Sequence, residues 1–310
     1  MRPPPRLAII GAFAALYIIW GSTYLAIRFA IDSIPPLIMS GTRYLIAGLV
    51  MYVIARLQGA TRSGWADWRT AAIVGACLLL GGNGGVALAE QYIPSGLAAV
   101  LVATVPIYIA LLGWLAGSGP KPTVTVWLGL LGGLCGVAIL LAPSLRIDAE
   151  HSNATFGMLM VVFAAFAWSA GSVYSRNAKN AASPFLAAGQ QMLCGGALLT
   201  LGGSLRGELH HLNPNRFTAL SIGAWIYLVL IGAVVGFTAY IWLLRHCDPA
   251  KVATYAYVNP IVAVLLGAAF AGEKLTVRTV IAAALIIGSV ALVITADQLR
   301  ARIRPPLPGG

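Results

Sequence analysis

Charged residues are scarce in this chain. Only 9% of its 310 residues are Asp, Glu, Lys or Arg, whereas 59% are hydrophobic and the mean hydropathy is +0.85. Soluble domains carry about 25% charged residues. The composition therefore excludes an ordinary soluble protein and indicates an integral membrane protein. No soluble domain fits between the hydrophobic stretches.

Acidic residues and cysteines are rarer still. The chain has nine acidic residues against 20 Lys and Arg. The four cysteines occur singly within or at the ends of hydrophobic stretches, and we expect them to pack as small apolar residues. The pair His210-His211 with Glu208 has no third ligand at a suitable spacing, so the sequence predicts no metal site and no cofactor.

Ten stretches are apolar over roughly the 20 residues that a helix needs to cross a bilayer. They predict an all-α integral membrane protein with short connections. The predicted helices cover residues 7–28, 37–57, 69–91, 95–117, 124–142, 155–176, 184–205, 218–244, 250–271 and 277–296.

Basic residues are distributed unevenly between the two sides of these helices. The N-terminus, the even-numbered connections and the C-terminal tail hold 13 of the 20 basic residues, and the odd-numbered connections hold 6. Basic residues favour the cytoplasmic side, so both termini, including the tails 1–6 and 300–310, are predicted to be cytoplasmic. The net charge of +11 is thus a topology signal, and no nucleic-acid partner is expected.

Short motifs recur at an offset near 150 residues. Gly21-Ser22-Thr23-Tyr24 is echoed by Gly171-Ser172-Val173-Tyr174, and a tryptophan closely precedes each motif (Trp20 and Trp168). The two halves, 7–142 and 155–296, each contain five predicted helices. Because five is odd, the second half must enter the membrane from the opposite side. The sequence therefore predicts two inverted five-helix repeats.

Two of the predicted helices contain an interior proline at corresponding places. Pro106 lies in the stretch 93–113 and Pro260 in the stretch 248–267. Proline removes a backbone hydrogen bond from a helix, and a freed carbonyl in lipid must be satisfied by protein or by a water-filled cavity. The pairing favours hinges beside a cavity between the halves. A simple packing kink is the alternative for either proline alone.

Several of these stretches resemble a known family. LYIIWGSTY (16–24), PPLIMSGTRYLIAG (35–48), VALAEQYIPSGLAAVLVATVPI (86–107), AWSAGSVYSR (167–176), ATYAYVNPIVAVLLG (253–267) and GEKLT (272–276) are similar to the EamA family of the drug/metabolite transporter superfamily, especially its YedA-like members. The resemblance implies ten helices in two inverted halves and export of metabolites or amphipathic compounds through a central cavity. Glu273 has no counterpart in the first half, so the two ends of that cavity need not be equivalent.

Two charged residues fall inside predicted helices, where charge is costly and often functional. Arg43 lies in the second helix and Glu90 at the end of the third, and both are predicted near the outer face. At similar depth the two could pair and so close or shape the outer end as a gate. A structural ion pair or an arginine reaching toward the interface is an equally good interpretation.

Aromatic and polar residues near the middle of the helices are candidates to line the cavity. Their rings would supply apolar surface, and their hydroxyl and amide groups would orient a small-molecule substrate. Packing against glycines and interhelical hydrogen bonding are the alternatives. The candidates are Trp20, Tyr24, Asn83, Thr104, Trp168, Tyr174, Tyr240, Tyr255 and Asn259.

Together these features predict a secondary transporter in the bacterial cytoplasmic (inner) membrane that exports small metabolites by alternating access. Proton-coupled multidrug efflux is an alternative, although Glu90 is the only acid inside a predicted helix. A membrane-embedded lipid-modifying enzyme is disfavoured because no catalytic cluster is seen, and a non-transporting membrane partner is disfavoured by the repeat. The sequence leaves open a monomer or a homodimer.

Overall fold

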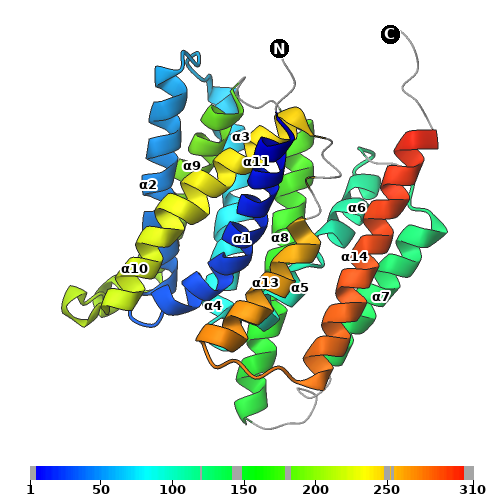
Figure 1. The fold of residues 1–310 in the computed structure, drawn as a ribbon. Helices are drawn as coiled ribbons and strands as arrows, with labels where there is room; N and C mark the ends of the chain where they lie inside the picture. Colours follow the sequence, from blue (N-terminus) through cyan, green and yellow to red (C-terminus); the bar gives the residue numbers. More distant parts are fainter. Residues whose placement is uncertain are drawn as a thin grey trace.

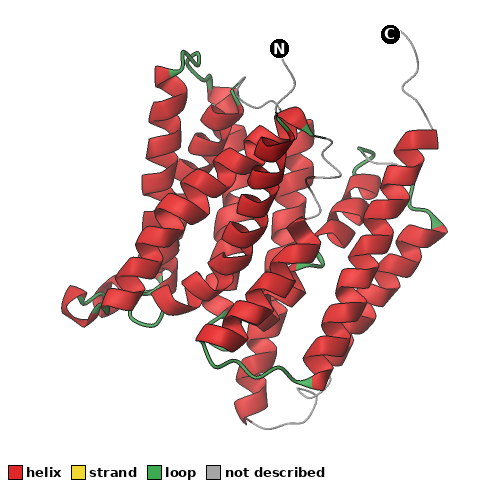
Figure 2. Cartoon of the chain, viewed as in Figure 1, coloured by secondary structure: helices red, strands yellow, loops and turns green. Residues whose placement is uncertain are grey.

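The computed structural model describes residues 5–118, 121–141, 149–178, 183–247, 252 and 255–303. Parts of both predicted tails, and most of the predicted start of the ninth helix at 250–254, lie outside these ranges. Within them the chain is helical and contains no strand (Figure 2).

Each of the ten predicted stretches overlaps a helix. The α-helices are α1 (Arg6–Ala30), α2 (Pro36–Leu57), α3 (Trp65–Gly75), α4 (Gly85–Ala89), α5 (Ser95–Val102), α6 (Val105–Leu115), α7 (Val124–Leu141), α8 (Ala149–Asn177), α9 (Pro184–Leu205), α10 (Ala219–Tyr227), α11 (Gly236–His246), α13 (Tyr255–Phe270) and α14 (Val277–Ile303). Two π-helical segments, η1 (Ala76–Gly84) and η5 (Leu228–Val235), join α3 to α4 and α10 to α11. Two short 3₁₀ turns, η3 (Glu208–His211) and η4 (Pro214–Arg216), precede α10.

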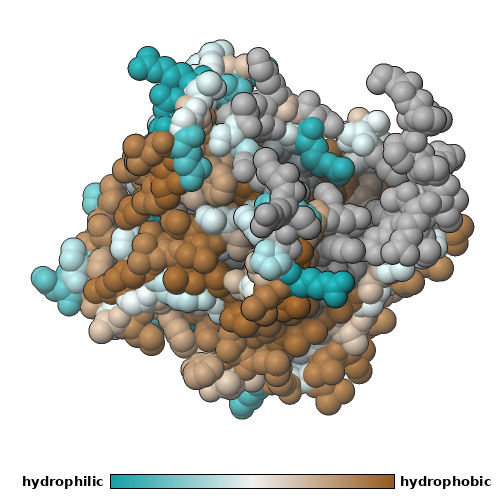
Figure 3. Space-filling model, turned by 45° about the horizontal axis from the view of Figure 1, so that its top comes forward, coloured by the Kyte–Doolittle hydropathy of each residue, from teal (hydrophilic) through white to brown (hydrophobic). Residues whose placement is uncertain are grey.

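Seven helical stretches in the described part of the chain are long and apolar enough to cross a membrane. Large apolar side chains remain exposed along them, as at Ile18, Leu49 and Phe163. In the space-filling view, brown hydrophobic surface is extensive, and teal hydrophilic surface is limited to small separate patches (Figure 3). An apolar flank is what lipid requires, so these features support a multi-pass membrane protein.

The helices stand side by side, and α1 begins and α14 ends at the same end of the bundle (Figure 1). α2 packs extensively against α9, and α7 against α14, while α1 contacts α10, α11 and α13. Helices from the two halves of the sequence therefore form the main pairs. We call the opposite end, where α1 ends at Ala30 and α5 begins at Ser95, the Glu90 end.

Glycines bring α2 and α9 into backbone contact. A Cβ added at Gly48 would lie 2.8 Å from the amide nitrogen of Leu193 and 3.0 Å from the carbonyl oxygen of Gly189. A Cβ at Gly196 would lie 2.8 Å from the amide nitrogen of Leu45. Small residues permit such close approach in lipid, where packing rather than the hydrophobic effect drives helix association.

The two proline-containing helices differ in form. The first is broken: α5 ends at Val102, a turn covers Ala103 and Thr104, and Pro106 stands in the first turn of α6. The Ser169 hydroxyl of α8 lies 2.7 Å from the carbonyl oxygen of Ala165 in its own helix and 3.1 Å from that of Val105, the first residue of α6. The second is continuous, because α13 runs through Pro260. The prolines thus occupy unequal backbone contexts.

The close α2–α9 contact predicts a matched pair of glycine substitutions. Gly48→Ala should lower the melting temperature in detergent by several degrees, because its methyl group would meet backbone atoms of α9. Gly223→Ala in α10 adds the same methyl group where no atom lies within 4 Å. Alanine favours helix over glycine by about 1 kcal/mol, so this control should melt at the wild-type temperature or above it. Equal melting temperatures for the two variants would contradict the contact.

Candidate functional site

An aromatic cluster of Trp20, Phe237, Tyr240 and Tyr255 joins α1, α11 and α13. The Trp20 ring centroid lies 5.4 Å from that of Phe237, 5.2 Å from Tyr240 and 5.0 Å from Tyr255. Trp20 and Tyr255 meet edge to face at 89°, an arrangement that aromatic quadrupoles favour. The cluster brings together three of the predicted substrate-binding residues.

The π-helical segment η5 positions Trp20 within this cluster. Its indole nitrogen donates a hydrogen bond to the carbonyl oxygen of Gly232, at 3.3 Å. A Cβ at Gly236 would lie 2.5 Å from the same nitrogen, so a glycine is needed there to seat the ring. π-Helical turns often occur at functional sites. The cluster therefore stands against an irregular stretch of helix rather than a regular one.

Other predicted binding residues lie outside the cluster. Tyr24, on α1, is half-buried and packs against the apolar core around α5 and α8. Trp168 and Tyr174 are half-buried on α8, where the Trp168 ring faces Gly82 of η1. Asn83 accepts a hydrogen bond from Arg43 at 3.0 Å. These residues occupy different helices, and their predicted role in binding stays a prediction.

Thr104 and Asn259 are both buried. The Thr104 hydroxyl donates a hydrogen bond at 2.7 Å to the carbonyl oxygen of Leu101, three residues earlier in the chain. The Asn259 side-chain oxygen is buried and has no hydrogen-bond partner. Asn259 thus retains an open acceptor within α13, whereas Thr104 is satisfied locally.

Two glutamates from the second half of the chain cap helices of the first half at the Glu90 end. Glu273, in the connection between α13 and α14, accepts from the Ser95 amide and hydroxyl at 2.7 Å each and from the Gly96 amide at 3.0 Å. Glu208 accepts from the amides of Leu37 and Ile38 at 3.0 Å each. We call Glu208 and Glu273 the capping glutamates. A carboxylate suits the positive end of a helix dipole and satisfies amides that have no partner inside the helix.

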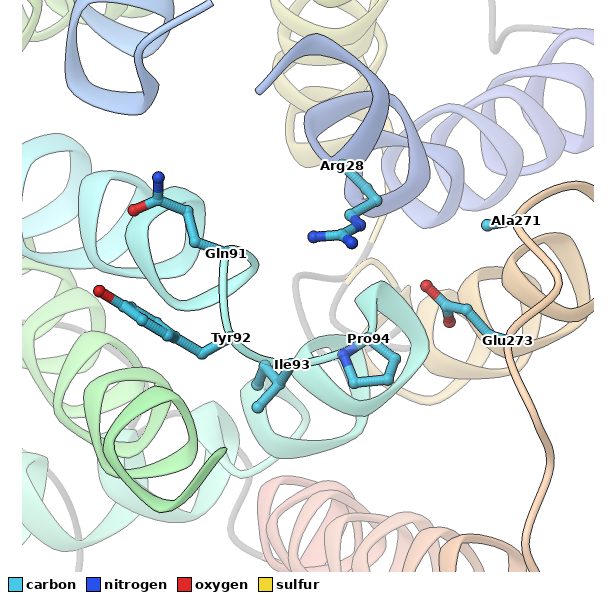
Figure 4. Close-up of a pocket in the computed structure, with 7 residues that line it drawn as sticks. All are labelled: Arg28, Gln91, Tyr92, Ile93, Pro94, Ala271 and Glu273. Carbon is cyan, nitrogen blue, oxygen red and sulfur yellow. The ribbon is translucent and has the colours of Figure 1, made fainter. Parts of the chain in front are cut away.

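A small cavity of about 200 Å³ opens beside Glu273. Arg28 and Glu273 face it from α1 and from the α13–α14 connection, and the turn 91–94 forms another wall (Figure 4). Arg28 also donates a hydrogen bond to the main-chain oxygen of Glu90, at 2.5 Å. The cavity thus carries one positive and one negative side chain at the end of the bundle.

The predicted partners Arg43 and Glu90 are both buried, at 3% and 0% exposure. Arg43 donates to the hydroxyl of Tyr44 at 2.9 Å and to Asn83, and its guanidinium also lies 4.4 Å from the Tyr44 ring centroid. Neither carboxylate oxygen of Glu90 has a hydrogen-bond partner. The structure thus directs the Arg43 bonds to neutral groups, and the gating role of the two residues stays a prediction.

Sequence reasoning missed several residues of this region. Phe237 precedes Tyr240 by three positions, a helical spacing that places both rings on one face. Arg28 enters the sequence prediction only as one of the six basic residues of the odd-numbered connections, and the capping glutamates lie 170 to 178 positions from the amides that they bind. The helical spacing would have revealed Phe237, whereas nothing local to Glu208 or Glu273 identifies their targets.

Comparison with known proteins gives consistent matches along the whole chain. The model of the EamA-like transporter family matches residues 6–142 and again residues 155–295. The uncharacterized inner membrane transporter YedA of Escherichia coli K12 is 37% identical over 94% of this chain and 92% of its own length. The uncharacterized transporter YvbV of Bacillus subtilis 168 is 25% identical over 96% and 94% of the two chains.

A solved crystal structure superposes with a TM-score of 0.63 over 94% of this chain and 98% of the other, at 22% identity, which supports the fold alone. The two family matches and the identity to YedA agree with the apolar flanks and helical bundle described above. The chain belongs to the EamA-like transporter family.

Proposed function

We propose that this protein is a secondary transporter that exports small metabolites, such as amino acids or related amphipathic compounds, across the bacterial cytoplasmic membrane. Membership of a transporter family and the relationship to an inner membrane transporter support the general activity and location. The direction, substrate class and mechanism are the proposal. The distribution of basic residues supports a cytoplasmic location for both termini, which is part of the proposal.

One observation supports the proposed mechanism: irregularities of the backbone occur at corresponding places in the two halves of the chain. The π-helical segments η1 and η5 interrupt the third and eighth predicted helices. The only residues with left-handed backbone in the described part of the chain are four glycines, which fall into two matching pairs, Gly59 with Gly207 and Gly117 with Gly272. These pairs, and the double family match, support two inverted repeats of five helices each.

Inverted repeats support alternating access, in which one half rocks against the other around a central site. The helix pairs α2–α9 and α7–α14 each combine one helix from either half. Breaks in helices, as between α5 and α6, supply points at which such motion can occur without loss of the remaining hydrogen bonds. The substrate would then meet one side of the membrane at a time.

The aromatic cluster supports an amphipathic substrate. Its four rings offer apolar surface, and the Tyr240 and Tyr255 hydroxyls offer polar contacts. An aromatic or other apolar amino acid fits this chemistry. A lipophilic cation is the competing substrate, because aromatic faces also attract cations.

The cluster predicts a specific loss of ligand binding. Apolar amino acids should raise the melting temperature of the purified wild-type protein, because a ligand that binds only the folded state stabilises it. Trp20→Ala should weaken this binding by at least about fivefold, since loss of one aromatic contact costs on the order of 1 kcal/mol beyond the area lost. Trp127→Ala is the matched control, because Trp127 is 42% exposed on α7.

If only lipophilic cations raise the melting temperature, drug efflux would replace metabolite export as the proposed function. An equal shift in wild type and Trp20→Ala would contradict the assignment of the cluster to the binding site.

The break at Pro106 predicts an unequal effect of the two prolines on transport. Pro106→Ala restores a backbone amide where α5 and α6 are separated, so it should favour a continuous helix and slow transport in sealed vesicles more than it changes ligand binding. Pro260→Ala should slow transport less, because α13 is already continuous. Hinges of equal importance at Pro106 and Pro260 would give equal effects instead. Unchanged rates in both variants and in the double variant would exclude a hinge at either proline.

A further inference from the structure

Three glutamates meet the Glu90 end of the bundle, and only one of them has no hydrogen-bond donor. Glu273 receives three hydrogen bonds and Glu208 two. Glu90 follows the last residue of α4, is 0% exposed, and receives none at either carboxylate oxygen. Glu208 is nearly as buried, at 7% exposure, so burial alone does not distinguish them.

Ionisable groups surround Glu90 from several directions. Tyr24 and Arg28 belong to α1, Arg43 to α2, and Glu273 to the α13–α14 connection. The negative charge of Glu273 repels an ionised Glu90, whereas the two arginines attract it. Tyr44 of α2 stands beside Arg43. α8 packs against α4 through apolar residues such as Ala164.

In the described part of the chain, no donor forms a hydrogen bond with the Glu90 carboxylate. Arg28 donates to the main-chain oxygen of Glu90, not to its carboxylate. Arg43 donates to Tyr44 and Asn83, and its buried Nε has no partner. An ionised carboxylate without a partner costs many kcal/mol to bury, and such a group is expected to bind a proton instead. Both nearby arginines bind neutral acceptors, as expected if the Glu90 side chain is protonated and neutral.

We infer that Glu90 is a proton-binding site, protonated when the Glu90 end is closed as in this structure. Loss of the proton would leave a carboxylate that draws Arg43 away from Asn83. Asn83 belongs to η1, so the exchange of partners would act on the irregular segment of the third helix. If the protein exports a substrate, as proposed above, this site would couple that export to the entry of a proton; this step rests on the proposed function.

The protonation is testable without any substrate. Dicyclohexylcarbodiimide is an apolar reagent that modifies protonated carboxylic acids, and peptide mass spectrometry locates the product. In full-length protein in detergent at neutral pH, Glu90 should be modified and Glu208 should not, because the carboxylate of Glu208 accepts hydrogen bonds from two backbone amides whereas that of Glu90 accepts none. Modification of Glu90 should disappear at alkaline pH. Labelling of Glu208 equal to or above that of Glu90 would overturn the inference.

A second measurement does not depend on access of a reagent. If the folded protein holds a proton on Glu90 that the unfolded chain releases, the folding equilibrium constant falls by up to about tenfold per pH unit above the ordinary range of glutamate. Glu90→Gln removes this pH-dependent loss of stability. The melting temperature of the variant should therefore exceed that of wild type by an amount that grows from acidic to alkaline pH.

Glu208→Gln is the control for this measurement, and it should melt below wild type because it weakens the cap of α2. Parallel pH profiles for wild type and Glu90→Gln would overturn the inference. Both readouts are independent of transport, so they can succeed even where the proposed export fails.

Discussion

Backbone amides at the start of a helix have no partner inside the helix, and lipid offers them none. In this protein two carboxylates from the second half of the sequence bind such amides in the first half: Glu208 caps α2 and Glu273 caps α5. Each carboxylate follows a helix of the second half and binds a helix of the first half. The halves are therefore joined at the Glu90 end by charge-assisted hydrogen bonds, which are stronger than neutral ones. The cavity beside Arg28 and the sealed environment of Glu90 depend on this closure.

The two ends of the bundle are not held in the same way. Gly207-Glu208 has its counterpart in Gly59-Ala60, and Gly272-Glu273 in Gly117-Ser118. Ser118 donates to the carbonyl oxygen of Gly113 in its own half, and the start of α9 is capped by its own Ser183 at 3.4 Å. In the described part of the chain, the carboxylates that cross between halves are thus at the Glu90 end alone. Under alternating access, opening that end requires these bonds to break.

Much of the fold could be predicted from sequence, because it follows from local patterns. Apolar stretches located the helices. The prolines identified the break before Pro106, but the continuous helix through Pro260 shows that tertiary packing can retain a proline within a helix. The π-helical segments, the neutral partners of Arg43 and the targets of the capping glutamates could not be predicted. They depend on which residues meet in space, and short-range propensity carries no such information.

The central claim is that the capping glutamates hold the Glu90 end together. Hydrogen exchange of the backbone amides at the starts of α2 and α5 tests this claim most directly. Exchange of a capped amide should accelerate when its own carboxylate is removed. Glu273→Ala should therefore speed deuterium uptake in the peptide containing Ser95 and Gly96 and leave that of Leu37 and Ile38 unchanged, and Glu208→Ala should do the reverse. Wild-type uptake in both peptides of both variants would contradict the account.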